Sequence, residues 1–119
     1  MKRWYVVQTK PGQEMVAELN LQRQDYRVYL PRTARKRRKA RKTHMIKAPL
    51  FPGYLFVELD LGHDRWRSVN GTFGVSALVS FGGRPSPLPA DVVAEIQARE
   101  DGHGLVQLEE ACPYAPQEP

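Results

Sequence analysis

The chain has very few of the residues that covalent or metal chemistry needs. Its single cysteine, Cys112, excludes an internal disulfide framework and agrees with a reducing compartment. The three histidines, His44, His63 and His103, stand far apart and show no metal-ligand spacing. No serine, histidine and acid stand in a recognisable catalytic arrangement. We therefore expect no enzyme, no cofactor and no metal.

Long apolar runs are also missing. No stretch approaches the roughly 20 residues that a membrane helix needs, and the apolar run 4–7 is too short for a signal peptide. We therefore expect a cytoplasmic monomer without a membrane partner. The 119 residues, of which 41% are hydrophobic, suit one compact domain with an adequate core.

Charge is distributed unevenly along the chain. Residues 1–50 hold fourteen Lys/Arg against three acids, whereas residues 51–119 hold four against ten. Within the basic half, eight of the eleven residues 32–42 are basic and none is acidic. Mutual repulsion disfavours packing, so we expect a mobile hairpin tip or loop there, contacting the phosphates of a nucleic acid. The alternative is a solvated loop without a ligand. The nucleic-acid residues assigned here are Arg35, Lys36, Arg37, Arg38, Lys39, Arg41 and Lys42.

The order of patterns predicts an α+β fold. Alternating or β-branched residues predict strands over 3–9, 26–30, 53–60 and 74–81, with residues 43–48 as the return arm of a basic hairpin. Helical patterns cover 13–24, 62–69 and 90–99. We expect an antiparallel, four-stranded or so sheet flanked by helices, with a protruding basic β-hairpin. We assign residues 1–100 to this domain and residues 101–119 to a linker.

In the first helix, the spacing of Met15, Val16 and Leu19 predicts the face that packs on the sheet. Near its end, Asn20, Arg23 and Gln24 could pair with base edges, although composition alone favours a solvated helix face. Lys10, in the preceding turn, would add a phosphate contact.

The strand around residues 54–59 is apolar on both faces. Side chains alternate along a strand, so Leu55, Val57 and Leu59 point one way and Tyr54 and Phe56 the other. We expect the second face to be partly open to solvent, together with Tyr5 and Val7. Either that face waits for a partner, or both aromatics are core residues beneath another layer.

Taken in order, several segments resemble one family. WYVVQTKPG (4–12), LFPGYLFV (50–57), residues 66–75 and the loop 81–88 look like the N-terminal (NGN) domain of NusG-type transcription elongation factors. Residues 51–58 and 74–76 resemble the specialised RfaH-like antiterminators within this family. Asn20 and Phe73 depart from that branch, which has a histidine and an arginine there. Residues 65–67 look more like general NusG.

The resemblance implies a function. The domain would bind the clamp helices of the largest subunit of bacterial RNA polymerase, suppress pausing and raise processivity. It would also touch DNA, in the RfaH-like case the non-template strand, and contact the polymerase gate loop. Family members usually continue into a KOW domain after a linker. The polymerase-binding residues assigned are Phe51, Tyr54, Phe56, Phe81, Ile96, Arg65, Trp66 and Arg67. A different class, a free-standing RNA-binding module of ribosomal type, is the alternative.

Overall fold

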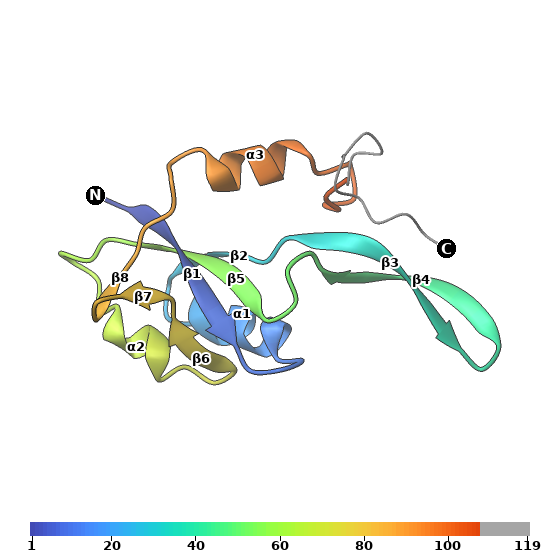
Figure 1. The fold of residues 1–119 in the computed structure, drawn as a ribbon, viewed down its shortest axis with the longest axis horizontal. Helices are drawn as coiled ribbons and strands as arrows, with labels where there is room; N and C mark the ends of the chain where they lie inside the picture. Colours follow the sequence, from blue (N-terminus) through green and yellow to red (C-terminus); the bar gives the residue numbers. More distant parts are fainter. Residues whose placement is uncertain (108–119) are drawn as a thin grey trace.

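The structure is a computed structural model that describes residues 1–107. The elements are β1 (Arg3–Thr9), α1 (Glu14–Gln22), β2 (Arg27–Tyr29), β3 (Arg32–Lys39), β4 (Lys42–Pro49), β5 (Tyr54–Leu59), α2 (Arg67–Asn70), β6 (Val75–Leu78), β7 (Ser80–Phe81), β8 (Arg84–Pro85) and α3 (Val92–Ala98). As the sequence predicts, they form an α+β fold built on a four-stranded antiparallel sheet (Figure 1). The strand order is β2-β5-β1-β6. A separate β3–β4 hairpin extends beyond the sheet, and β7 and β8 form a short hairpin after β6. Within residues 1–107, no helix combines the length and apolar character that crossing a membrane requires.

One face of the sheet carries the main core. Leu55, Val57 and Leu59 of β5 are fully buried there, as expected, against Ala17 and Leu21 of α1. The side of α1 that packs on the sheet is not the predicted one. The side chains expected in the core are exposed, namely Met15, Val16 and Leu19.

Glu14 gives the reason for this rotation of α1. Its carboxylate accepts a hydrogen bond of 2.8 Å from the backbone N–H of Gly53, which draws a charged residue into the interface. A buried carboxylate with a hydrogen-bond donor is tolerated where an unpaired one is not. Hydrophobic spacing alone therefore points to the wrong side of this helix.

The second face of the sheet is built from a different set of residues than expected. Val6 pairs with Phe56 and Gln8 pairs with Tyr54 in the β1–β5 register, and cross-strand partners share a face. The expectation that Tyr5 and Val7 lie beside Tyr54 and Phe56 is therefore wrong, and both are buried in the main core. In Figure 1, α3 lies on the other side of the sheet from α1 and α2.

The basic block forms the protruding hairpin that the sequence predicts, and most of it is paired strand rather than loop. β3 pairs with β4 along its whole length. Most cations of β3 stand opposite uncharged partners, for example Lys36 opposite Met45 and Arg38 opposite Thr43. Like charges face each other directly only at the last pair, Lys39 and Lys42, so repulsion across the ladder is limited.

The tip of this hairpin is a two-residue turn under backbone strain. Ala40 and Arg41 both have positive φ, 54° and 65°, as the type I′ turn requires. Left-handed backbone costs most L-residues about 1–2 kcal/mol each, and Asn and Gly adopt it readily. Replacing the pair by Asn-Gly (Ala40→Asn with Arg41→Gly) should therefore stabilise the closed hairpin by about 1–2 kcal/mol. Slower amide hydrogen exchange along β3 and β4 would report it; unchanged exchange, equal to that of an Arg41→Lys control, would contradict it.

The turn that follows α3 holds the base of the hairpin. Val106 N–H donates to the carbonyl of Arg32 at 2.7 Å, and the hydroxyl of Thr33 donates to the carbonyl of Val106 at 3.1 Å. The Arg32 guanidinium also pairs with Glu18 of α1 at 2.7 Å. The expected domain boundary at residue 100 falls inside this packed region, and the part of the expected linker over 108–119 lies outside the described residues.

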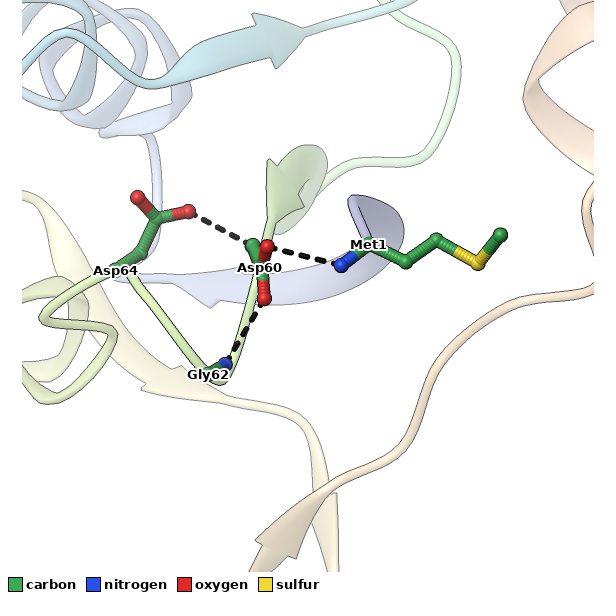
Figure 2. A network of polar contacts seen from close by, with 4 residues as sticks. All are labelled: Met1, Asp60, Gly62 and Asp64. Atoms are coloured by element: carbon green, nitrogen blue, oxygen red, sulfur yellow. Dashed lines mark hydrogen bonds and ion pairs between the residues drawn. The ribbon is translucent and has the colours of Figure 1, made fainter.

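The ends of β1 and β5 are joined at Asp60 (Figure 2). Its carboxylate accepts hydrogen bonds from the N-terminal ammonium of Met1 at 2.9 Å and from the N–H of Gly62 at 3.0 Å. These two bonds, the first being the larger effect, hold the pKa of Asp60 below its usual range. The Asp64 carboxylate accepts the Asp60 N–H at 2.7 Å, which fixes the turn that leads toward α2.

Candidate protein and nucleic-acid interfaces

The turn before β5 presents two exposed aromatic side chains. Phe51 is 42% exposed and Tyr54 is 41% exposed. Tyr54 N–H donates to the carbonyl of Phe51 at 3.0 Å, and the carbonyl of Gly53 accepts Thr9 N–H at 2.8 Å. With the Glu14 carboxylate on Gly53 N–H, the turn is held from β1 and from α1. Phe51 and Tyr54, here called the aromatic surface, therefore stand on a turn that two elements hold in place.

Phe56 is placed differently from the open position expected for it. It is only 6% exposed. Its ring stacks on Tyr29 at a centroid distance of 6.2 Å and meets Phe51 edge-on at 6.1 Å. The Tyr29 hydroxyl in turn donates to the Glu100 carboxylate, and burial followed by this bond raises the pKa of Tyr29. Phe56 thus supports the aromatic surface from below, and the reading that it is a covered residue is correct.

The other two apolar residues assigned to this surface lie in separate elements. Ile96 is half-buried on α3. Phe81 is 82% exposed at the β7–β8 hairpin. Val79 N–H bonds the carbonyl of Val6, so the chain beyond it runs toward the start of β1, whereas Tyr54 pairs near its end. Phe81 and Tyr54 therefore lie toward opposite ends of β1.

The segment 65–67 leads into α2, which begins at Arg67. Trp66 is half-buried against the main core, and the Arg67 guanidinium lies over its ring at 4.5 Å from the centroid. The Arg65 side chain is exposed, and the backbone carbonyl of Arg65 accepts a hydrogen bond from the Tyr26 hydroxyl at 3.0 Å. Trp66 thus anchors the segment, while the two arginines face solvent.

Two of the four polar residues assigned near the first helix, Lys10 and Gln24, contact the loop 72–74. Lys10 N–H donates to the carbonyl of Gly74 at 2.8 Å, and Gln24 Nε2 donates to Thr72 Oγ1 at 2.7 Å. Asn20 Nδ2 bonds the Val16 carbonyl one turn earlier in the same helix. Arg23 is exposed at the C-terminal end of α1. The structure therefore gathers residues that are up to 64 positions apart, Lys10 and Gly74 among them.

Phe73 is the residue at this loop that sequence reasoning did not assign to a site. It is 79% exposed, between Gly74, which lies close to the backbone of Ala17 in α1, and Thr72, which bonds Gln24 just beyond the helix. The exposure of Phe73 and the positive φ of Gly74, +87°, are properties of the fold. The sequence showed only that Phe73 departs from the arginine of the RfaH-like branch.

The β3–β4 hairpin is the third candidate surface. Every side chain from residue 34 to residue 45 is exposed. The seven cations assigned there all lie in this stretch, on both strands and the turn. Among residues 1–107, no group of three or more His, Cys, Asp and Glu side chains could hold a metal ion.

Comparison with known proteins identifies the family. The family model described as "Transcription termination factor nusG" matches residues 2–97. The chain belongs to the NusG family. The transcription termination/antitermination protein NusG of Thermus thermophilus is 37% identical over 108 residues, covering 78% of this chain and 59% of that protein. NusG of Bacillus subtilis, with the same description, is 35% identical over 99 residues, covering 73% and 56%.

A solved structure supports the same assignment. The structure described as "Domain interaction in Thermotoga maritima NusG" superposes with a TM-score of 0.57 at 28% identity, covering 82% of this chain and 54% of that one. The chain thus spans somewhat more than half the length of the NusG proteins it matches.

Proposed function

We propose that this NusG-family domain is a bacterial transcription elongation and antitermination factor domain that binds RNA polymerase through its aromatic surface. The single observation that carries the proposal is the pair Phe51 and Tyr54, exposed on a turn that is hydrogen-bonded to both β1 and α1. Large aromatic side chains on rigid supports are typical anchors of protein interfaces. The names of the relatives, which refer to transcription termination and antitermination, agree with this role.

The partner we propose for this surface is the pair of clamp helices of the largest polymerase subunit. A helix tip would cover Phe51 and Tyr54, with Ile96 of α3 as a further contact. Arg65 and Arg67, exposed at α2, would face the gate loop across the cleft. A domain that touches both sides of the cleft favours the closed, elongating polymerase over the open, paused one, because it binds the first state better.

The nucleic-acid contacts we propose fall on two surfaces. Lys10, Asn20, Arg23 and Gln24 would meet the exposed non-template strand, and the basic hairpin would add sequence-independent phosphate contacts. An RfaH-like, operon-specific role remains a prediction from the sequence. Enrichment of one DNA element over random DNA by the polymerase-bound domain would support that role.

The proposal is tested by capture of bacterial RNA polymerase on the immobilised domain. Tyr54→Ala should weaken binding about 10- to 100-fold, the range of about 1.4–2.8 kcal/mol expected for an interface anchor. Because Tyr54 is exposed, circular dichroism and thermal unfolding should stay close to those of the parent domain. Polymerase lacking the clamp helices should not be captured.

Leu19→Ala is a matched control for this test. Leu19 is an exposed large side chain on α1, five residues beyond the Glu14 that bonds the aromatic turn, and its truncation should leave capture unchanged. Equal capture by the parent and Tyr54→Ala domains would contradict the interface. RNA binding without any polymerase binding would favour the ribosomal-type RNA module instead.

A further inference from the structure

The β3–β4 ribbon carries positive charge on both of its faces. In an antiparallel ladder, directly paired residues share a face and successive pairs alternate. The pair of Thr33 with Ala48 therefore defines one face, here called face A, and the pair of Ala34 with Lys47 defines the other, face B. Face A carries the cations Arg35, Arg37, Lys39 and Lys42, and face B carries Lys36, Arg38 and Lys47.

Neither face is covered beyond the base of the ribbon. At the base, Ala48 is buried and Thr33 bonds the Val106 carbonyl, so face A packs on the domain only there. Further out, all seven cations of the two faces are exposed, and the ribbon contains no acidic residue. A ribbon that served one flat anionic surface or one strand would need cations on one face only.

The dimensions of the ribbon fit between two walls of phosphate. A two-stranded sheet with side chains on both faces is about 10 Å thick, judged from the spacing at which sheets stack. The major groove of B-form DNA is about 12 Å wide and admits a two-stranded ribbon, whereas the minor groove is about 6 Å wide. The major groove of A-form duplexes is deep and narrow, and side chains do not read it.

We propose that the β3–β4 ribbon enters the major groove of B-form duplex DNA with face A toward one phosphate backbone and face B toward the other. The inference deepens the proposed function and rests on its claim that the hairpin contacts nucleic acid. The cations of each face neutralise the phosphates of one strand, and the strained turn at Ala40 and Arg41 leads into the groove. Binding of this kind is independent of sequence and steeply salt-dependent.

Two variants with equal charge loss separate the faces. The face A variant carries Arg35→Gln, Arg37→Gln and Lys39→Gln, and the face B variant carries Lys36→Gln, Arg38→Gln and Lys47→Gln. For a random-sequence DNA duplex, each should flatten the plot of log affinity against log salt concentration by about 2.7, or about 0.9 per lost phosphate contact. Each should also weaken binding at least tenfold at 0.1 M salt. If only one variant does so, the ribbon lies with one face on its ligand and the proposal is wrong.

A third variant of the same net charge is the control. Lys2→Gln, Arg3→Gln and Arg84→Gln remove three exposed cations outside the ribbon and should leave the slope unchanged. Circular dichroism of all three variants must match the parent domain. A slope change in the control as large as in the face variants would mean that net charge alone governs binding, and would overturn the proposal.

The choice of nucleic acid separates this inference from the function on which it rests. The parent domain should bind the DNA duplex more tightly than single-stranded DNA or double-stranded RNA of equal length. Equal or tighter binding of either would overturn the groove proposal while leaving nucleic-acid contact by the hairpin intact. If the parent domain bound none of the three nucleic acids, nucleic-acid contact by the hairpin would be removed from the proposed function as well. Capture of polymerase through Tyr54 would be unaffected in both cases.

Discussion

Replacing Phe56 by alanine is expected to lower the free energy of unfolding by about 3–5 kcal/mol, the usual range for a buried phenylalanine. The side chain is 6% exposed and lies between the rings of Tyr29 and Phe51. Its removal would leave a cavity under the aromatic surface. The ring of Phe51 would also lose the side chain against which it packs. Urea unfolding of the isolated domain, followed by circular dichroism, measures the loss.

This result would separate stability from binding at the aromatic surface. Phe56→Leu keeps most of the buried volume and should lose far less stability than Phe56→Ala. A Phe56→Ala domain that unfolds at the parent's midpoint would show that the ring is not packed as described. Loss of polymerase capture in Phe56→Ala is therefore no evidence of direct contact, and Tyr54 is the residue that reports on the interface.

Replacing Gly74 by alanine is expected to lower the free energy of unfolding by about 3 kcal/mol or more. Its φ of +87° would strain any L-residue, at about 1–2 kcal/mol. An added Cβ would also lie 2.7 Å from the backbone N of Ala17, so α1 and the loop 72–74 would have to separate. That separation would also strain the hydrogen bond from Lys10 N–H to the Gly74 carbonyl.

Gly12 provides the matched control for this prediction. It also has positive φ, +71°, but nothing lies within 4 Å of the position its Cβ would take. Gly12→Ala should therefore lose only the backbone term, about 1–2 kcal/mol. Thermal unfolding of both variants measures the difference. Equal losses would show that α1 and the loop 72–74 are not in close contact.

The strands were predictable because their signals are local. β1 occupies the predicted residues 3–9, and the antiparallel sheet, with Leu55, Val57 and Leu59 in the core, follows from alternation alone. The side of α1 was not predictable, because it depends on a hydrogen bond between Glu14 and Gly53, 39 residues apart. The neighbours of Phe56 likewise depend on register, which one sequence pattern does not define.

The candidate surfaces were predictable in composition and not in arrangement. Tyr54 and the basic residues could be named from the sequence, but the distribution of cations over two faces required the pairing of β3 with β4. The meeting of Lys10 with the loop at Gly74 likewise required the fold. Phe73 had no signal of its own, since an exposed aromatic in a short loop reads like any turn residue.

Contacts at the base of the β3–β4 ribbon fix how far the ribbon extends from the domain. Val106 bonds the backbone of Arg32, and the Arg32 side chain is held by Glu18, so the hairpin leaves the domain from a defined position. Its eight paired residues extend about 27 Å, at about 3.4 Å per residue. If the proposed polymerase and groove contacts both form, this fixed length would limit contact to duplexes held within about 27 Å of the base of the hairpin.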